Sequence, residues 1–260
     1  MSDFSTAHAA PGSGTFSVGA VLKRSFSTFF ANFVPFCVLA LIFYLPTLIS
    51  GFSTNFSAGG GVEVEGIPQY GAGDFAIILL SMVLTYALVG ALVYGTVQHL
   101  NGRKAGIGEI IGHGFSRIVP VIAIAIIFSI ALSIGFLLLI IPGIFLVVVW
   151  SVAIPASVVE RPGIFGAFSR SWDLTKGYRW PVLGLLLILL AILLGFGLVT
   201  GAVAGFVVFS MDSLMLLVIV NYVISAISGT LMSVVIAVLY HDLRVAKEGV
   251  STAQIAAVFD

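Results

Sequence analysis

The chain has 260 residues, of which 60% are apolar and only 8% are charged. A soluble domain carries about 25% charged residues, so most of this protein's surface must face lipid. The 11 basic and 11 acidic residues balance, which disfavours nucleic-acid binding because no basic surface can form. A single cysteine, Cys37, excludes an internal disulfide and a cysteine-based zinc site.

Charge-free stretches predict where the chain crosses the membrane, since about 20 apolar residues traverse the hydrocarbon layer. The stretch 118–159 is too long for one span, and the turn signal Ile141-Pro142-Gly143 divides it into two. Pro46 in the first span and Pro155 in the fourth should each kink or end a helix. The six predicted spans are residues 34–52, 75–98, 119–141, 143–159, 181–207 and 214–240.

These spans predict an all-α, polytopic membrane protein whose six transmembrane helices form three hairpins, with amphipathic interfacial helices on the cytoplasmic side. Residues 1–15 are a predicted disordered polar tail without a cleavable signal peptide. Residues 16–245 form the predicted membrane domain, and residues 246–260 a short cytoplasmic tail helix.

Basic residues predict the orientation, because lysine and arginine collect on the cytoplasmic side. With six spans, all 11 basic residues fall on one side of the membrane. The opposite loops carry only Glu63, Glu65, Asp74 and Asp212. We therefore expect a multi-pass protein with both termini in the cytoplasm.

A related pattern occurs before three of the spans. Arg24-Ser25-Phe26 and Arg170-Ser171-Trp172 stand at the same distance before a proline, and Phe115-Ser116-Arg117 is a weaker relative. The pattern predicts three repeats, each an amphipathic helix followed by a membrane hairpin, over residues 16–103, 107–160 and 163–245. The alternative is that every such hairpin needs a basic lead-in, which would create the likeness without a repeat.

The lead-in segments place aromatic and basic residues at helical spacing, which is typical of helices lying in the membrane interface. One interpretation is recognition of anionic lipids or of a protein partner on the cytoplasmic face. Anchoring and topology control are the favoured alternative, because a basic residue near an anionic surface gains about 1 kcal/mol in any protein. The candidate head-group or partner contacts are Lys23, Arg24, Arg170, Trp172, Lys176 and Arg179.

No ionisable residue lies near the centre of a predicted span, which disfavours ion-coupled transport. Asn221 is the most polar residue there, and we expect it to form an interhelical hydrogen bond, with a ligand contact as the alternative. Small residues at four-residue spacing predict close packing between spans five and six, with homodimerisation through the glycine face as the lesser alternative. The residues in these packing faces are Gly197, Gly201, Gly205, Ser225, Gly229 and Ser233.

Catalytic patterns are missing from the sequence. The four histidines are scattered over tails and interfaces, so we expect no metal site. Ser228-Gly229 resembles the serine motif of rhomboid-type proteases, but Ala226 replaces a motif residue and no span offers a histidine base near its centre. We expect no catalytic residue and no cofactor, and therefore no enzyme.

Three patches together resemble a bacterial family, the glycerophosphoryl diester phosphodiesterase membrane domain. They lie at residues 141–144, 160–177 and 240–249, and the resemblance extends over nearly the whole chain after the tail. It implies a helical bundle in the bacterial inner membrane without catalysis of its own. Because only 20 residues follow Tyr240, far fewer than the roughly 250 of a catalytic barrel, we expect a stand-alone member.

The expected function is that of a non-enzymatic inner-membrane protein with a membrane-organising or partner-supporting role in envelope or lipid biology. The alternative is a transporter or channel subunit for a neutral or lipid-like substrate. A polar cavity lined by Asn221 and Ser225 would favour this alternative. Membrane lipids are the expected partners, with a protein on the cytoplasmic face as a further candidate, and the sequence does not indicate an oligomeric state.

Overall fold

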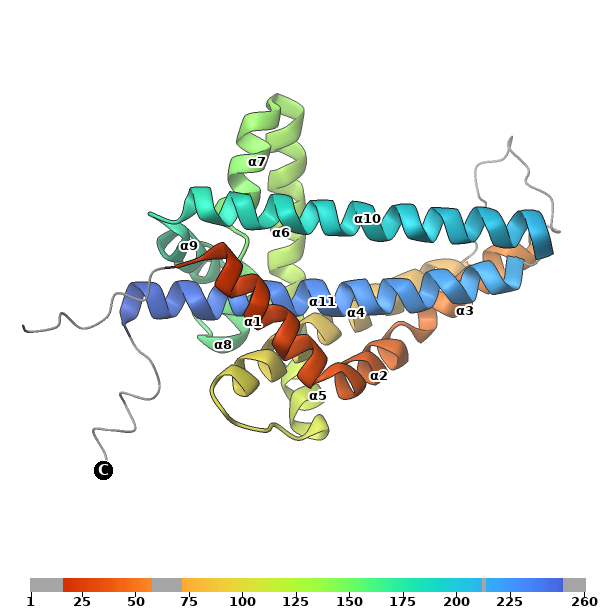
Figure 1. Ribbon diagram of the computed structural model, residues 1–260, viewed down its shortest axis with the longest axis horizontal. Helices are drawn as coiled ribbons and strands as arrows, with labels where there is room; N and C mark the ends of the chain where they lie inside the picture. The colour runs from red at the N-terminus through yellow and green to blue at the C-terminus, as the bar shows by residue number, and fades with distance from the viewer. Residues whose placement is uncertain (1–15, 58–71, 212–213, 250–260) are drawn as a thin grey trace, which may run out of the picture.

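The computed structural model describes residues 16–57, 72–211 and 214–249, and the elements in these ranges are all α-helices (Figure 1). In chain order they are α1 (Val18–Ala31), α2 (Phe33–Phe43), α3 (Leu45–Ser57), α4 (Ala72–Leu100), α5 (Ile107–Ser116), α6 (Ile118–Leu138), α7 (Ile140–Val149), α8 (Ala153–Val159), α9 (Ile164–Thr175), α10 (Arg179–Met211) and α11 (Leu214–Glu248). The predicted tail 1–15 lies outside the described residues. So does most of the predicted tail helix 246–260, of which residues 246–248 continue α11.

The helices make this a multi-pass membrane protein. Within the described ranges, five helical segments are long and apolar enough to cross a membrane. They are Phe75–Leu100, Ile118–Leu138, Ile140–Val159, Arg179–Val203 and Met215–Glu248. A sixth forms if α1 and α2, which meet at an angle of 78°, are counted as one broken span.

Two predicted proline breaks are confirmed. The first predicted span divides at Tyr44 into α2 and α3, and Pro46 is the second residue of α3. The fourth divides between α7 and α8, and Pro155 is the third residue of α8. Proline has no backbone N–H to continue the preceding helix, so each helix ends shortly before the proline and a new one begins.

The turn of the α6–α7 hairpin lies two residues earlier than predicted. Leu139 is extended at φ −165° and ψ 150°, and α7 begins at Ile140, so Pro142 falls in the first turn of a helix. Proline is tolerated there because the first N–H groups of a helix need no partner within it. Gly143 serves packing instead of the turn, since an added Cβ would lie 2.6 Å from the Phe136 ring.

The three predicted lead-in segments are the helices α1, α5 and α9. Each precedes a helix with proline as its third residue, namely Pro35 in α2, Pro120 in α6 and Pro181 in α10. The three units therefore share one local arrangement of a short helix and a proline-headed long or broken helix. Their place in the membrane interface stays a prediction.

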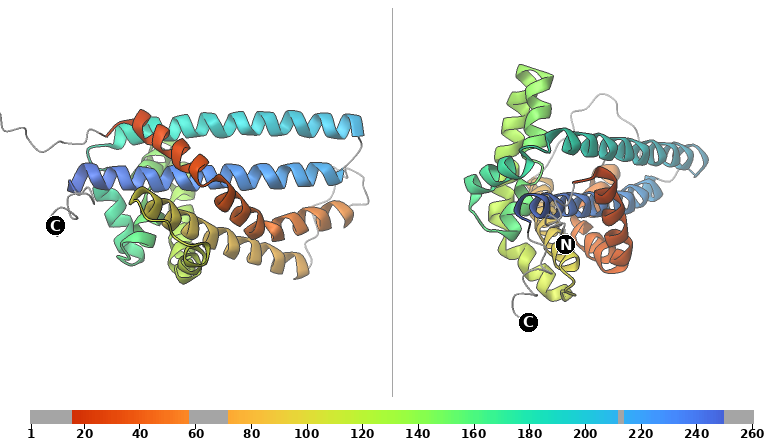
Figure 2. Two further views of the ribbon diagram at one scale, coloured as in Figure 1. Left: turned by 60° about the horizontal axis from the view of Figure 1, so that its bottom comes forward. Right: turned by 60° about the vertical axis from the view of Figure 1, so that its left-hand side comes forward.

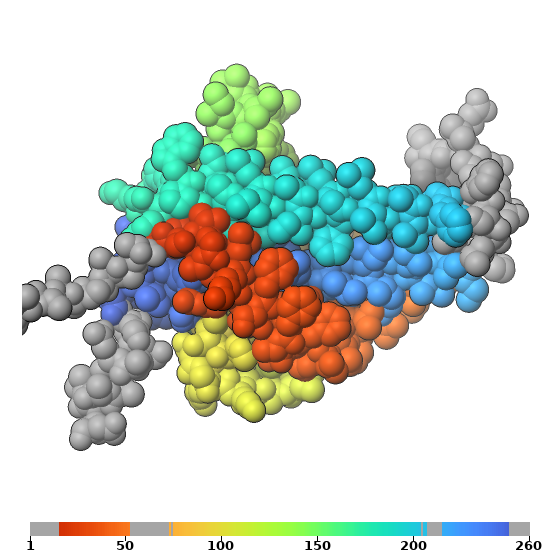
Figure 3. All heavy atoms as spheres, viewed as in Figure 1, coloured from red at the N-terminus to blue at the C-terminus, as the bar shows by residue number. Residues whose placement is uncertain are grey.

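The arrangement of the helices in space differs from three hairpins standing side by side. Helices α4, α10 and α11 run alongside one another, whereas the α6–α7 hairpin lies across their direction (Figures 1 and 2). The hairpin projects from the rest of the molecule (green in Figure 3), and its apolar tip leaves Leu137 86% and Ile141 79% exposed. A hairpin returns to the side it left, so the predicted sorting of basic residues does not require this one to cross the membrane.

Helix α4 is central, because it packs against α11, α5, α2, α3, α6 and α8. Its small residues admit close neighbours, above all the end of α5 at Gly114. A Cβ added at Gly114 would lie 2.4 Å from the Ala87 carbonyl oxygen and 2.9 Å from the Ala91 Cβ. Only a glycine allows this approach of one backbone to another.

We therefore predict that Gly114→Ala lowers the free energy of unfolding by about 1–3 kcal/mol, because a methyl group would be forced against backbone. Gly112→Ala in the same helix is the matched control, since an added Cβ there meets nothing within 4 Å. It should leave stability unchanged or raise it by about 0.5–1 kcal/mol. Thermal unfolding of the two purified variants in detergent would contradict this packing if both behaved alike.

Candidate functional site

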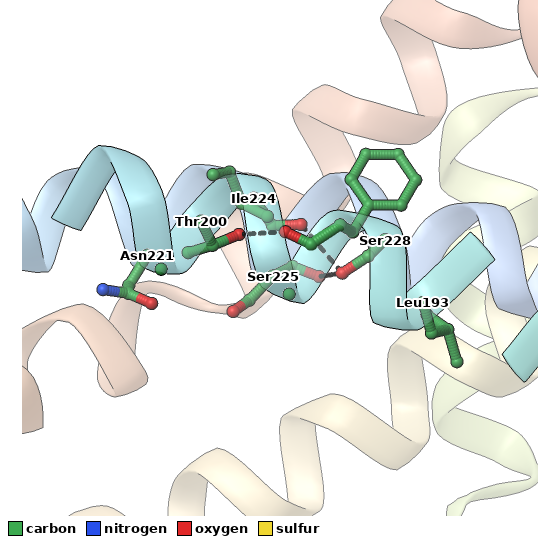
Figure 4. A pocket seen from close by; sticks show the side chains of 9 residues that line it. Leu193, Thr200, Asn221, Ile224, Ser225 and Ser228 are labelled. Carbon is green, nitrogen blue, oxygen red and sulfur yellow. Dashed lines mark hydrogen bonds between the residues drawn. The ribbon is translucent and has the colours of Figure 1, made fainter. Parts of the chain in front are cut away.

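Helices α10 and α11 lie side by side but leave a groove of about 450 Å³ between them (Figure 4). We call it the α10–α11 groove. It is lined by Leu193, Phe196, Gly197, Thr200, Gly201, Asn221, Ile224, Ser225 and Ser228. None of these residues is charged, and four carry an amide or a hydroxyl group.

The predicted packing of Gly197, Gly201 and Gly205 against α11 is wrong. All three are exposed, and a Cβ added at any of them would meet nothing within 4 Å. The physical reason is that α10 joins the core near its start, between Val182 and Leu189, and the three glycines lie farther along the helix. Homodimerisation through the glycine face stays a prediction.

The small residues of α11 divide between two faces. Gly229 lies against the α2–α3 junction, where an added Cβ would be 2.7 Å from the Tyr44 hydroxyl. Ser233 is buried and donates to the Gly229 carbonyl at 2.9 Å. Ser225, by contrast, is exposed and lines the groove.

Asn221 does not form the predicted interhelical hydrogen bond with any described residue. Its Nδ2 donates to the Leu217 carbonyl of its own helix at 3.1 Å, and the side chain is exposed on the groove. The neighbouring Tyr222 forms an interhelical bond instead, with its hydroxyl donating to the Leu41 carbonyl of α2. The Asn221 Oδ1 atom accepts no hydrogen bond from the described residues and is available to a ligand.

The hydroxyl groups of the groove offer mainly acceptors. Thr200 Oγ1 donates to the Phe196 carbonyl at 2.7 Å, and Ser228 Oγ donates to the Ile224 carbonyl at 2.8 Å (Figure 4). Each oxygen keeps lone pairs that can accept. The Ser225 hydroxyl has no partner among the described residues and can donate as well as accept.

The groove lies deep in the predicted membrane layer. Asn221 and Ser228 follow the first residue of α11 by 7 and 14 positions, which corresponds to roughly 10 and 20 Å along a helix. If α11 crosses a hydrocarbon layer about 30 Å thick from its first residue, we expect the groove near the middle of that layer.

An apolar cavity of about 360 Å³ lies on the other face of α11, where Gly229, Met232, Ser233 and Ile236 line it. Its polar side-chain atoms belong to Tyr44, Trp150, Ser151 and Ser233, and the rest of its lining is apolar. The remaining lining residues are Val89, Val93, Ile124, Phe128, Val147, Ala153, Ile154, Pro155, Leu186, Gly229, Met232 and Ile236. Its size falls in the range of small-molecule sites, which is about 300–1,000 Å³.

A hydrogen-bonded ion network joins the helices at the end of the molecule that carries the basic residues, which we call the basic end. The Glu160 carboxylate accepts from Arg170 Nε at 2.6 Å, from Arg170 Nη2 at 2.9 Å and from the Tyr240 hydroxyl at 2.7 Å. Arg170 also pairs with Glu248, which accepts from Arg244 Nε at 2.9 Å. The network ties the end of α8, α9 and the end of α11 to one another.

Two of the predicted head-group contacts are engaged within the chain. Hydrogen bonding to Glu160 raises the pKa of Arg170 above the usual arginine value, against the effect of its partial burial. Arg170 therefore serves the network as a permanent cation instead of facing lipid. Arg24 pairs with Asp242 of α11.

The other predicted contacts remain open to lipid or to a partner. Lys23 and Lys176 are exposed and form no ion pair with the described residues. The Arg179 guanidinium lies 4.5 Å from the Trp172 ring centroid and 5.1 Å from that of Phe145. This cation–π arrangement holds the charge of Arg179 beside aromatic residues.

Sequence reasoning missed the partners of Arg170. Glu160, Tyr240 and Glu248 all lie in the patches that carry the family resemblance, and each stands near the basic end of a span. Their common position at the basic end of the spans was the signal in the sequence that could have indicated their contact with Arg170. Within the described ranges, no three His, Cys, Asp or Glu side chains come together in a way that could hold a metal ion.

A family described as Domain of unknown function (DUF7847) matches residues 72–243. The chain belongs to this family. The match runs from α4 to α11 and includes the groove, the apolar cavity apart from Tyr44, and most of the ion network. No curated protein and no solved structure matches the chain. The resemblance to the glycerophosphoryl diester phosphodiesterase membrane domain stays a prediction.

We predict that Glu160→Gln lowers the free energy of unfolding by about 2 kcal/mol, because it removes charge-assisted hydrogen bonds at a half-buried site. Arg170→Met should cost a similar amount, and the double variant should cost at least about 1 kcal/mol less than the sum. Lys176→Met, at an exposed cation, should stay within about 0.5 kcal/mol. Additive effects of the two substitutions in urea unfolding would contradict a shared network.

Proposed function

We propose that this protein binds an uncharged, lipid-like molecule in the α10–α11 groove, without catalysing a reaction, as a transporter or channel subunit would. The observation that carries the proposal is the polar lining between two long apolar helices, which we expect to lie near the middle of the membrane. Asn221 and Ser225 are exposed there and have polar atoms without partners among the described residues. Polar groups in hydrocarbon need a partner, and substrate sites of transporters lie near the midplane.

The chemistry of the groove selects a neutral molecule. Its lining holds no charge, so a cationic or anionic group would be desolvated there without a counter-charge. A hydroxyl or amide of the ligand would donate to Asn221 Oδ1 and accept from Ser225. Gly197 and Gly201 leave open space beside these atoms, and the apolar side chains of Leu193, Phe196 and Ile224 in the lining suit a hydrocarbon portion.

A binding role also agrees with the state of Ser228. Its hydroxyl donates to the Ile224 carbonyl of its own helix, whereas a serine nucleophile donates to a base that removes its proton. The groove lining contains no side chain that could act as such a base.

The test compares two exposed glycines of α10. Gly201→Leu fills the groove, and Gly195→Leu places the same side chain on α10 outside it, with open space at both positions. Binding of dioctanoylglycerol, an uncharged two-chain lipid, is measured by native mass spectrometry in mild detergent. We expect Gly201→Leu to weaken binding at least tenfold and Gly195→Leu to change it less than twofold.

Two results would contradict the proposal. One is equal lipid binding by both variants. The other is a wild-type dimer that binds no lipid and that Gly201→Leu converts to monomers, which would make the groove a contact between two copies of the chain.

A membrane-organising role is the second candidate, and the α6–α7 hairpin is the observation that favours it. The hairpin lies across α10 and α11 and projects with an exposed apolar tip (Figures 1 and 3). A hydrophobic hairpin embedded along the membrane plane would displace lipid in one leaflet and bend or order the bilayer around it.

Spin labels on two helices test this placement. Ile126, Ile130 and Ile134 of α6 are exposed at four-residue spacing, as are Leu190, Leu194 and Leu198 of α10. The first and last residues of each set are eight positions apart, which is about 12 Å along a helix. We expect depth to change along α10 by most of that length and along α6 by little. Equal depth gradients in both helices would show that α6 crosses the membrane.

A further inference from the structure

Arg117 joins α5 to α6 through its backbone, but its side chain forms no hydrogen bond or ion pair with any described residue. The Nε atom of this side chain is enclosed without an acceptor. Burial lowers the pKa of Arg117, because no carboxylate offsets the loss of water. A half-buried guanidinium group without an acceptor would gain hydrogen bonds and a counter-charge from an anion outside the chain.

Arg161, which follows α8, is a second cation that forms no hydrogen bond or ion pair with the described residues. It is exposed, and among the described residues it is the one non-glycine with positive φ, at 59°. Pro162 follows it, and a residue before proline normally takes an extended conformation. Strain of this kind persists at ligand sites, where it fixes a side chain in a required direction.

Helix α4 packs against both of the segments that lead to these two arginines. A Cβ added at Gly90 would lie 3.5 Å from the Gly114 Cα and 3.9 Å from the Val158 Cγ2. Gly114 precedes Arg117 by three residues, and Val158 precedes Arg161 by three. Val121, one turn after Arg117, and Val158 also belong to one buried cluster. The positive charge of Arg161 further lowers the pKa of Arg117, which agrees with this neighbourhood.

The nearest carboxylate in the sequence does not relieve this repulsion. Glu160 precedes Arg161 directly, but its oxygens accept from Arg170 and Tyr240 in the ion network. The network therefore occupies the Glu160 carboxylate, so this acid does not neutralise the positive charges of Arg117 and Arg161.

We propose that Arg117 and Arg161 together bind a phosphate group at the basic end of the protein. Guanidinium groups bind phosphate with paired N–H donors, and one anion between two cations would replace their repulsion with attraction. The phosphate belongs either to a lipid head group or to a soluble molecule. This site shares no residue with the α10–α11 groove, so it stands or fails independently of the proposed function.

The test measures the shift of the thermal unfolding midpoint of the detergent-solubilised full chain, since a ligand that binds the folded state stabilises it. The probes are dihexanoyl phosphatidic acid, inorganic phosphate, and dihexanoylglycerol, which has the same chains without the phosphate. Phosphatidic acid should raise the midpoint of the wild type more than dihexanoylglycerol does, because the latter can bind only the α10–α11 groove. Stabilisation by inorganic phosphate as well would assign the site to phosphate itself, and its absence would assign it to a lipid head group.

Three variants separate binding from folding. Arg117→Gln and Arg161→Gly should each raise the dissociation constant for phosphatidic acid at least tenfold. Arg161→Gly should also melt about 2 °C or more above the wild type without ligand, because glycine relieves the positive φ. The double variant Lys104→Gln, Lys247→Gln removes two exposed charges elsewhere and should change the dissociation constant less than twofold.

The proposal is overturned if neither phosphate probe stabilises the wild type. It is also overturned if the lysine double variant loses as much affinity as the arginine variants, because binding would then follow net charge alone. Unchanged affinity in Arg161→Gly would remove Arg161 from the site and contradict the pairing.

Discussion

The Glu160 carboxylate joins parts of the chain that are far apart in sequence. Glu160 directly follows α8. Its carboxylate accepts two hydrogen bonds from Arg170 of α9 and a third from Tyr240 of α11. An unpaired carboxylate at this depth would be costly, so α8, α9 and α11 must meet in one arrangement. The direction of the chain leaving α8 follows from it, and so does the neighbouring turn at Arg161.

The same constraint separates structural cations from available ones. Arg170, Arg244 and Arg24 form ion pairs with acidic residues of the chain. Arg117 and Arg161 have none among the described residues, and Arg179 lies against aromatic rings. The basic end therefore holds two groups of cations. One group forms the ion pairs that join the helices, and the other group can bind anions from outside the chain.

The membrane interior shows a comparable division. On α11, Gly229 and Ser233 lie on a packed face, whereas Asn221 and Ser225 open onto the groove with α10. All four are small or polar residues within one charge-free stretch. Their roles differ because α1, α2 and α4 pack on one side of α11, whereas α10 leaves the groove open on the other side.

The sequence by itself determined the all-helical membrane class, the breaks near Pro46 and Pro155 and the short helices before the long ones. These features are local, because hydropathy and the missing proline N–H act over a few residues. Only the tertiary structure decided that the α6–α7 hairpin lies across its neighbours, that Gly197 and Gly201 face open space, and that Glu160 takes Arg170 and leaves Arg161 unpaired. Those outcomes depend on which distant residues meet, and hydropathy and spacing along one chain carry no information about such pairings.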